Sequence, residues 1–194
     1  MTPSNKIAVT SAPILPALAE RWSPRSFDKS YKLSQHELLS LLEAGRWAPS
    51  ANNAQPTRYF VVTRDDAKHA DISATLAGWN QAWAPDASAI ILVAVAAANA
   101  DGNPNPFARY DAGQAVAHLS IQAHDLGLHV HQMAGLDAAK AAEILDVPAD
   151  LELVVSIVVG KIAAADLLPE PLHEREIAPR VRKDLDEIVL YGRP

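Results

Sequence analysis

Two short, predominantly apolar runs, Ser88–Ala97 and Leu151–Val159, constrain this fold more than any other feature of the sequence. Neither run alternates with polar residues, which is typical of strands that are covered on both faces. We therefore expect a central sheet flanked by helices. The most apolar stretch, Ala89–Ala98, is about half of the roughly 20 residues that a membrane-spanning helix needs, so we expect no membrane segment.

Helical and strand patterns alternate along the rest of the chain. Ser34 and Glu37 form a capping box ahead of a helical run of leucines that ends near Pro49. Gly127 is placed to end the long helix Tyr110–Leu126. Further strands are expected at Tyr59–Thr63 and His129–Gln132, and further helices at Ala12–Trp22, Asp65–Ala77, Trp79–Trp83 and Asp137–Leu145, with Ala165–Pro179 irregular.

These elements predict a mixed α+β sandwich, with residues 1–194 forming a single domain. The long helix Tyr110–Leu126 is rich in alanine and apolar on most sides, which predicts burial on most sides. A partner subunit would help to provide that burial, so the helix favours a homodimer.

Charge and cysteine content exclude several classes of protein. The chain has 17 Lys and Arg against 23 Asp and Glu, for a net charge of −6, so nucleic acid and anionic membranes are poor partners. Cysteine is absent, which excludes disulfides, a cysteine nucleophile and thiolate metal sites. We expect a cytoplasmic protein.

Three polar clusters could carry chemistry, and each has an ordinary alternative. Residues 21–27 hold two arginines and two serines, which suit a phosphate but also a solvated basic loop. Residues 48–56 place four short polar side chains between prolines, either as a binding surface or as a polar turn. Arg180 and Arg182 share one side of an extended chain, or belong to a surface charge run.

Other chemistry finds little support in the sequence. His129 and His131 would share a strand face, but no carboxylate lies at metal-ligand spacing nearby, so we expect no metal site. The chain has no phosphate-binding loop, dinucleotide fingerprint or serine nucleophile motif. No catalytic acid, base or nucleophile stands out.

Taken in order, the clusters resemble the FMN-dependent nitroreductase family. The pattern Arg-x-Ser-x-Arg-x-Phe at 21–27 precedes Ala-Pro-Ser-x-x-Asn-x-Gln-Pro at 48–56, and Arg-x-Arg follows at 180–182. Between them, residues 76–80, 110–115 and 132–135 also match family segments. The resemblance extends from about Ala17 to Gly192. Each motif is moderately specific, and five motifs in the right order are strongly specific.

The resemblance implies an intertwined homodimer with two FMN sites at the interface. It assigns the phosphate and ribityl chain to Arg21, Ser23, Arg180 and Arg182, and contacts from the other subunit to Ser50, Ala51 and Asn53. It assigns the flavin ring to Trp22, Arg25, Asn80, Met133, Ala134 and Gly135.

The implied activity is hydride transfer from NAD(P)H, through FMN, to a small electron-poor substrate such as a nitroaromatic or a quinone. Two alternatives stay open: a non-enzymatic FMN-binding or sensing dimer, and a reductase of the same fold acting on an enal or a halogenated phenol. Many family members carry Lys near the position of Trp83 and Glu at that of Ala134, and this chain lacks both charges.

Overall fold

A four-stranded antiparallel sheet forms the centre of the molecule in the computed structural model, which describes residues 3–99 and 101–192. The strands lie in the order β1-β2-β4-β3. The two apolar runs form the central strands, as predicted. The strands are β1 (Thr57–Thr63), β2 (Ala89–Ala96), β3 (His129–Met133) and β4 (Leu151–Gly160).

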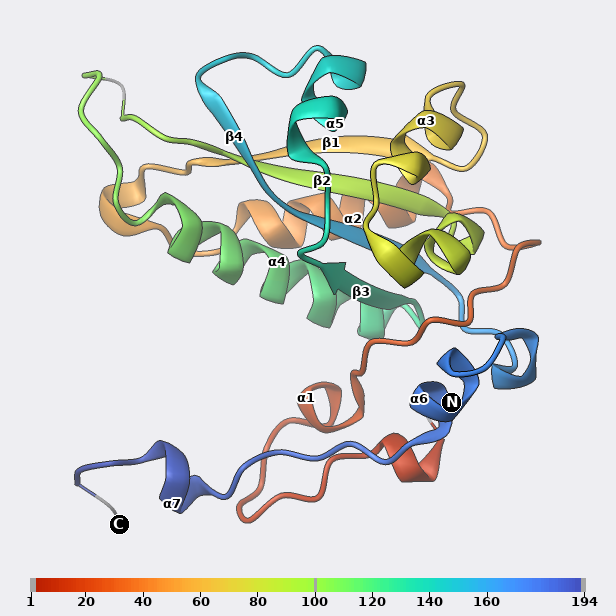
Figure 1. Cartoon of the computed structure of the whole chain (residues 1–194). Coiled ribbons are helices and arrows are strands. Elements are labelled where there is room, and N and C mark those ends of the chain that lie inside the picture. The colour runs from red at the N-terminus through yellow and green to blue at the C-terminus, as the bar shows by residue number, and fades with distance from the viewer. Residues whose placement is uncertain (1–2, 100, 193–194) are drawn as a thin grey trace.

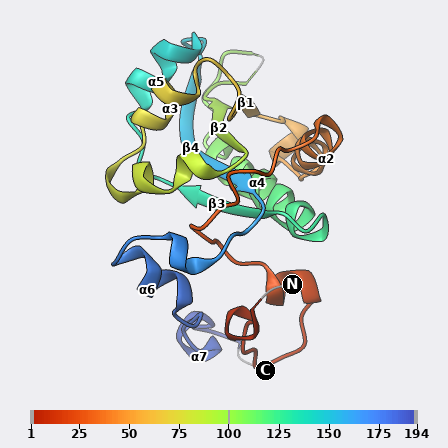
Figure 2. The same cartoon turned by 90° about the vertical axis from the view of Figure 1, so that its right-hand side faces the viewer.

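Two helical layers cover the sheet, α2 and α4 on one face and α3 and α5 on the other (Figures 1 and 2). Successive residues of β2 point to opposite faces of the sheet. Ile91 packs with Leu41 and Leu119 in one core, and Leu92 packs with Ile72 in the other. This arrangement confirms the mixed α+β fold. The helices are α1 (Pro16–Glu20), α2 (Gln35–Arg46), α3 (His69–Ala74), α4 (Ala108–Asp125), α5 (Ala138–Leu145), α6 (Leu172–Ile177) and α7 (Leu185–Ile188).

The predicted signals at helix ends are present. The Ser34 hydroxyl accepts from the Glu37 amide while the Glu37 carboxylate accepts from the Ser34 amide. Asp137 caps α5 through the Lys140 amide, and Gly127 follows α4 with a φ of 70°. Short 3-10 turns complete the chain at η1 (Ser4–Lys6), η2 (Ala51–Asn53), η3 (Gly78–Ala82), η4 (Ala84–Asp86) and η5 (Ala165–Leu167). Among the described residues, no helix is long and apolar enough to cross a membrane.

Three expectations about local structure were wrong. The helix expected over Ala12–Trp22 is reduced to α1, because the residue before a proline is pushed out of the helical region, as Leu15 is before Pro16 (ψ 138°). The helix expected over Asp65–Ala77 is reduced to α3, because the Asp66 carboxylate bonds the Lys68 amide in a turn. The segment expected to be irregular contains α6.

The helix α4 is buried on one side only within a single chain. Ala112, Ala115 and Leu119 face the core, while Gly113 and Ala117 are exposed. The expectation of burial on most sides is therefore not met by one chain alone.

An N-terminal and a C-terminal segment of the chain pack together, apart from the sheet and beyond α4 (Figures 1 and 2). The Asn5 side chain donates to the Ile177 carbonyl at 2.8 Å, and the Ala8 amide donates to the Ala19 carbonyl at 2.9 Å. This packing brings the first and third polar clusters into one region.

Candidate functional site

Three arginines lie where the N-terminal and C-terminal segments pack together. Arg180 is fixed by donating to the carbonyls of Lys6 (2.9 Å) and Ala19 (2.6 Å), and Arg21 follows α1 directly. Burial, and then the charges of Arg180 and Arg182, lower the pKa of Arg21. Burial and the charge of Arg182 likewise lower the pKa of Arg180.

This arginine cluster (Arg21, Arg180 and Arg182) has no acidic counter-charge among the residues that the structure describes. Across residues 3–99 and 101–192, no carboxylate lies within ion-pair distance of these three side chains. Guanidinium groups bind phosphate oxygens in pairs, and repulsion among the three charges is relieved by an anion. Ser23 lies 3.4 Å from Arg21 Nη1 and adds a neutral hydroxyl. The donor set therefore fits a phosphate group.

The edge strand β3 runs beside the segment that follows Arg21. The ring of His129 lies edge-on to Trp22 at 6.3 Å, and His131 Nδ1 lies 2.8 Å from the Pro24 carbonyl oxygen. Burial lowers the pKa of both histidines to about 4, so both are neutral at pH 7. The two histidines pack β3 against residues 22–24.

The other residues predicted to contact the flavin ring lie at or near the end of β3. Met133 is buried, Ala134 is exposed, and the Gly135 carbonyl accepts from the Ala77 amide at 3.0 Å. A Cβ added to Gly135 would lie 3.7 Å from Asn80 Nδ2, so Asn80 lies beside this stretch. Trp83 is 1% exposed and stacks with Phe27, so it belongs to the core.

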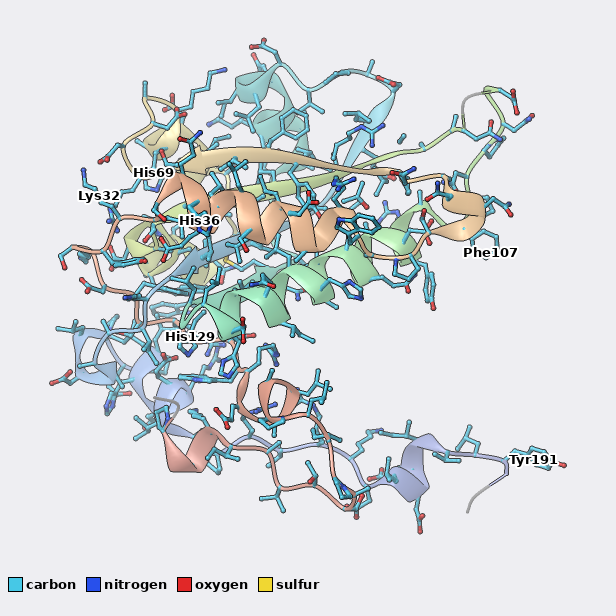
Figure 3. The ribbon with its side chains drawn as sticks, turned by 180° about the vertical axis from the view of Figure 1, so that it is seen from behind. Lys32, His36, His69, Phe107, His129 and Tyr191 are labelled. Carbon is cyan, nitrogen blue, oxygen red and sulfur yellow. The ribbon has the colours of Figure 1, made fainter. Side chains whose placement is uncertain are left out.

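The second polar cluster lies elsewhere. The Ala51 amide bonds the buried Asp111 carboxylate near the start of α4, whereas His124 near its end lies 3.6 Å from Glu20. Thirteen residues of helix separate Asp111 from His124, which is about 20 Å. Figure 3 shows Phe107, which precedes α4, and His129, which follows it on β3, on opposite sides of the molecule. Ser50, Ala51 and Asn53 are thus remote from the arginine cluster within one chain.

The loop that carries this second cluster is held in an unusual conformation. Asn52, Asn53 and Gln55 have φ values of 51°, 55° and 46°, in the left-handed region that costs non-glycine residues energy. The Ser50 hydroxyl fixes the turn by accepting from the Gln55 amide at 3.0 Å. A hollow of about 310 Å³ lies beside Ser50, between α2, β1 and α4.

Two buried charged residues that belong to none of the sequence motifs contact the segment that follows Arg21. Lys6 is 4% exposed and its Nζ lies 4.5 Å from the centre of the Trp22 ring. Glu176, 3% exposed, bonds the backbone amides of Arg25 and Ser26. Sequence reasoning missed both, because neither stands in a local motif and their partners lie far away in the chain.

The fold is a mixed α+β sandwich that carries the motifs in the order noted above, and comparison with known proteins gives its family. A model of the nitroreductase family matches residues 18–82 and 66–161. The chain belongs to the nitroreductase family, as the motifs predicted.

Individual relatives agree with this assignment. A crystal structure described as an oxidoreductase containing FMN superposes with a TM-score of 0.91 at 34% identity, covering 100% of this chain and 98% of that one. An uncharacterized 15.4 kDa protein of Mycolicibacterium smegmatis is 33% identical over 70% of this chain and 96% of its own length. The major NAD(P)H-flavin oxidoreductase of Aliivibrio fischeri is 37% identical over 42% of this chain and 38% of its own length.

Proposed function

We propose that this chain is an FMN-dependent oxidoreductase that takes electrons from NAD(P)H and reduces a small electron-poor molecule, such as a nitroaromatic or a quinone. The observation that carries the proposal is the arginine cluster, which has no carboxylate partner among the described residues. FMN ends in a phosphate with about two negative charges at pH 7, which this cluster would neutralise. The relatives described as containing FMN and as an NAD(P)H-flavin oxidoreductase support it.

The chain's own residues would bind and orient the cofactor. Arg21, Arg180 and Arg182 hold the phosphate, with Ser23 on the ribityl chain. The ring would be held by Trp22, Arg25, Asn80 and the stretch Met133, Ala134 and Gly135. The bound flavin supplies the hydride-transfer chemistry.

We propose further that the working unit is a homodimer in which Ser50, Ala51 and Asn53 reach the flavin of the partner. They lie near the start of α4 and the arginine cluster lies beyond its end, about 20 Å of helix away, which supports contacts to the flavin of the partner rather than to that of the same chain. The chain exposes 11219 Å², against about 8,900 Å² for a compact monomer of 20.8 kDa. The excess includes Val181, Leu190 and Tyr191, which are 77%, 84% and 97% exposed. Tyr191 lies far out on the C-terminal arm in Figure 3.

Phosphate recognition is tested by comparing FMN with riboflavin. Removing Arg182 (Arg182→Ala) should weaken FMN binding by about 1.5–3 kcal/mol, roughly 10–150-fold, and leave riboflavin binding unchanged. Lys183→Ala is the matched control, since Lys183 is an exposed neighbouring cation. Equal affinities of wild type for FMN and riboflavin would overturn the phosphate assignment.

Catalysis is tested separately from binding. Protein loaded with FMN is mixed with NADH or NADPH without oxygen, and the flavin absorbance is followed. Rapid bleaching is expected for an oxidoreductase. Stable binding without bleaching by either donor would replace this proposal with that of a flavin-binding protein without reductase activity.

A further inference from the structure

Glu176 on α6 is a buried carboxylate that the family motifs do not include. Its Oε1 accepts from the amides of Arg25 (3.0 Å) and Ser26 (3.1 Å), and its Oε2 accepts from the Arg25 amide at 2.9 Å. The two amides are adjacent in the chain and lie about 150 residues from Glu176. This contact fixes the backbone of the segment that begins with Arg21 onto the C-terminal segment.

Glu176 also faces positive charge. Arg25 Nη1 lies 4.0 Å from Glu176 Oε2, and Glu176 is the one carboxylate within ion-pair distance of Arg25 in the part of the chain that the structure describes. Burial lowers the pKa of Lys6, and Glu176 is the neighbour that opposes this by favouring the charged amine, whereas Arg25 and Arg180 act with burial. Two cations, Arg25 and Lys6, thus face this one carboxylate.

A neutral side chain would be enough to bond the two amides. A glutamine carbonyl accepts two hydrogen bonds, and burying a neutral group costs much less free energy than burying a charge. The presence of a buried carboxylate is therefore explained by the cations around it. Of these, Arg25 keeps 25% of its side chain exposed and can still reach a ligand.

We propose that Glu176 is a positioning residue that fixes Arg25 at the flavin ring and offsets part of its positive charge. The inference rests on the proposed function, which places Arg25 beside the ring. A positive charge there favours reduced FMN, which carries more negative charge than oxidised FMN. By offsetting that charge, Glu176 keeps the reduction potential of bound FMN low.

The test is the midpoint potential of bound FMN in Glu176→Gln. The variant keeps the shape of the side chain and loses its charge, so the ratio of affinities for reduced and oxidised FMN should rise about tenfold. For a two-electron couple, this is a midpoint about 30 mV higher than in wild type. Glu174→Gln is the matched control on the same helix, because Glu174 is exposed, and its midpoint should equal that of wild type. An unchanged or lower midpoint in Glu176→Gln would overturn the proposal.

The Arg25→Gln variant tests whether Glu176 acts on the midpoint potential through Arg25. In Arg25→Gln protein, adding Glu176→Gln should change the affinity ratio by less than about threefold, because the residue through which Glu176 acts is gone. The same tenfold change in both backgrounds would overturn the role of Arg25. If Glu176→Gln does not fold, Glu176→Asp retracts the carboxylate by one methylene and should raise the midpoint in the same direction, and an unchanged midpoint would again overturn the proposal.

Failure of the proposed function is separable from failure of this inference. If wild type binds no FMN, the proposed function fails. If wild type binds FMN and Glu176→Gln leaves the midpoint unchanged, only the role of Glu176 fails. Hydrogen exchange of the Arg25 and Ser26 amides without FMN adds a flavin-free measurement. It should be equal in Glu176→Gln and Glu174→Gln, because the glutamine carbonyl still accepts from both amides. Faster exchange in Glu176→Gln would overturn the assignment of the midpoint change to charge.

Discussion

Gly45 on α2 lies where a larger side chain would strike Tyr59 of β1 and the backbone of α4. A Cβ at this position would lie 2.2 Å from the Tyr59 hydroxyl oxygen, 3.1 Å from Tyr59 Cζ and 3.3 Å from the Ala115 carbonyl oxygen. Real Cβ atoms do not approach other atoms to 2.2 Å, so Gly45→Ala must displace the Tyr59 ring. We expect Gly45→Ala to separate α2 from β1 and to destabilise the fold.

The expected magnitude follows from two opposing terms. Overpacking of a buried site costs about 1–3 kcal/mol, whereas replacing a helical glycine with alanine alone would stabilise by about 1 kcal/mol. Tyr59→Phe removes the atom that clashes, and this hydroxyl is buried with no hydrogen-bond partner among the described residues. We therefore expect Tyr59→Phe alone to stabilise by about 1 kcal/mol. Gly45→Ala should then cost at least about 1 kcal/mol less in the Tyr59→Phe background than in the wild-type background.

The assay is urea unfolding of wild type, both single variants and the double variant, with the free energy of unfolding compared in a cycle. Thermal unfolding gives a second reading, because 1 kcal/mol corresponds to about 2–4 °C in a domain of this size. Tyr59→Phe alone serves as the matched control for the loss of the hydroxyl. An equal cost of Gly45→Ala in both backgrounds would refute the steric reasoning.

Further predictions concern protonation, the dimer and the shared site. Because burial lowers the pKa of His131 to about 4, the unfolded chain binds more protons between about pH 4 and 6.5, and the free energy of unfolding should fall by up to roughly 3 kcal/mol as pH falls through that range. Urea unfolding at pH 7 and 5 should show a smaller difference in His131→Phe than in the exposed control His36→Phe, and equal differences would contradict the assignment. Gly113→Leu on the exposed face of α4 should yield monomers in light scattering, whereas Lys140→Leu on α5 should not, and a Gly113→Leu dimer would exclude this face. Mixing Asn53→Asp and Arg182→Ala chains should restore about one quarter of the activity, since about half of the dimers are mixed and each has one intact site of two. No recovery despite subunit exchange would place both residues in one chain's site.

Local patterns in the sequence predicted much of this fold. The predominantly apolar runs identified the two central strands, because strands covered on both faces rarely alternate with polar residues. The Ser34–Glu37 capping box located the start of α2. The helix predicted over Ala12–Trp22 was wrong because Pro13 and Pro16 disfavour helical backbone at the residues before them, so the helix is limited to Pro16–Glu20.

The candidate site was predictable only where a motif carries it. Arg21, Arg180 and Arg182 could be named from the sequence, and the structure places them in one region. Lys6 and Glu176 could not be named, because a lysine or a glutamate in a polar segment is ordinarily solvated. Their burial depends on contacts between segments about 150 residues or more apart, which no local pattern encodes.

The position of α4 connects the site with the proposed dimer. The arginine cluster lies beyond one end of α4 and the Ser50–Asn53 loop lies at its other end, while the face between them exposes Gly113 and Ala117. A twofold axis across this face would place the second chain's helix antiparallel or crossed on the first, so that the start of one α4 approaches the end of the other. The small residues would let the two helices pack closely, and the same contact would bring the loop of one chain to the arginine cluster of the other. Binding of FMN would then stabilise the dimer, because the ligand contacts a site that neither chain completes alone.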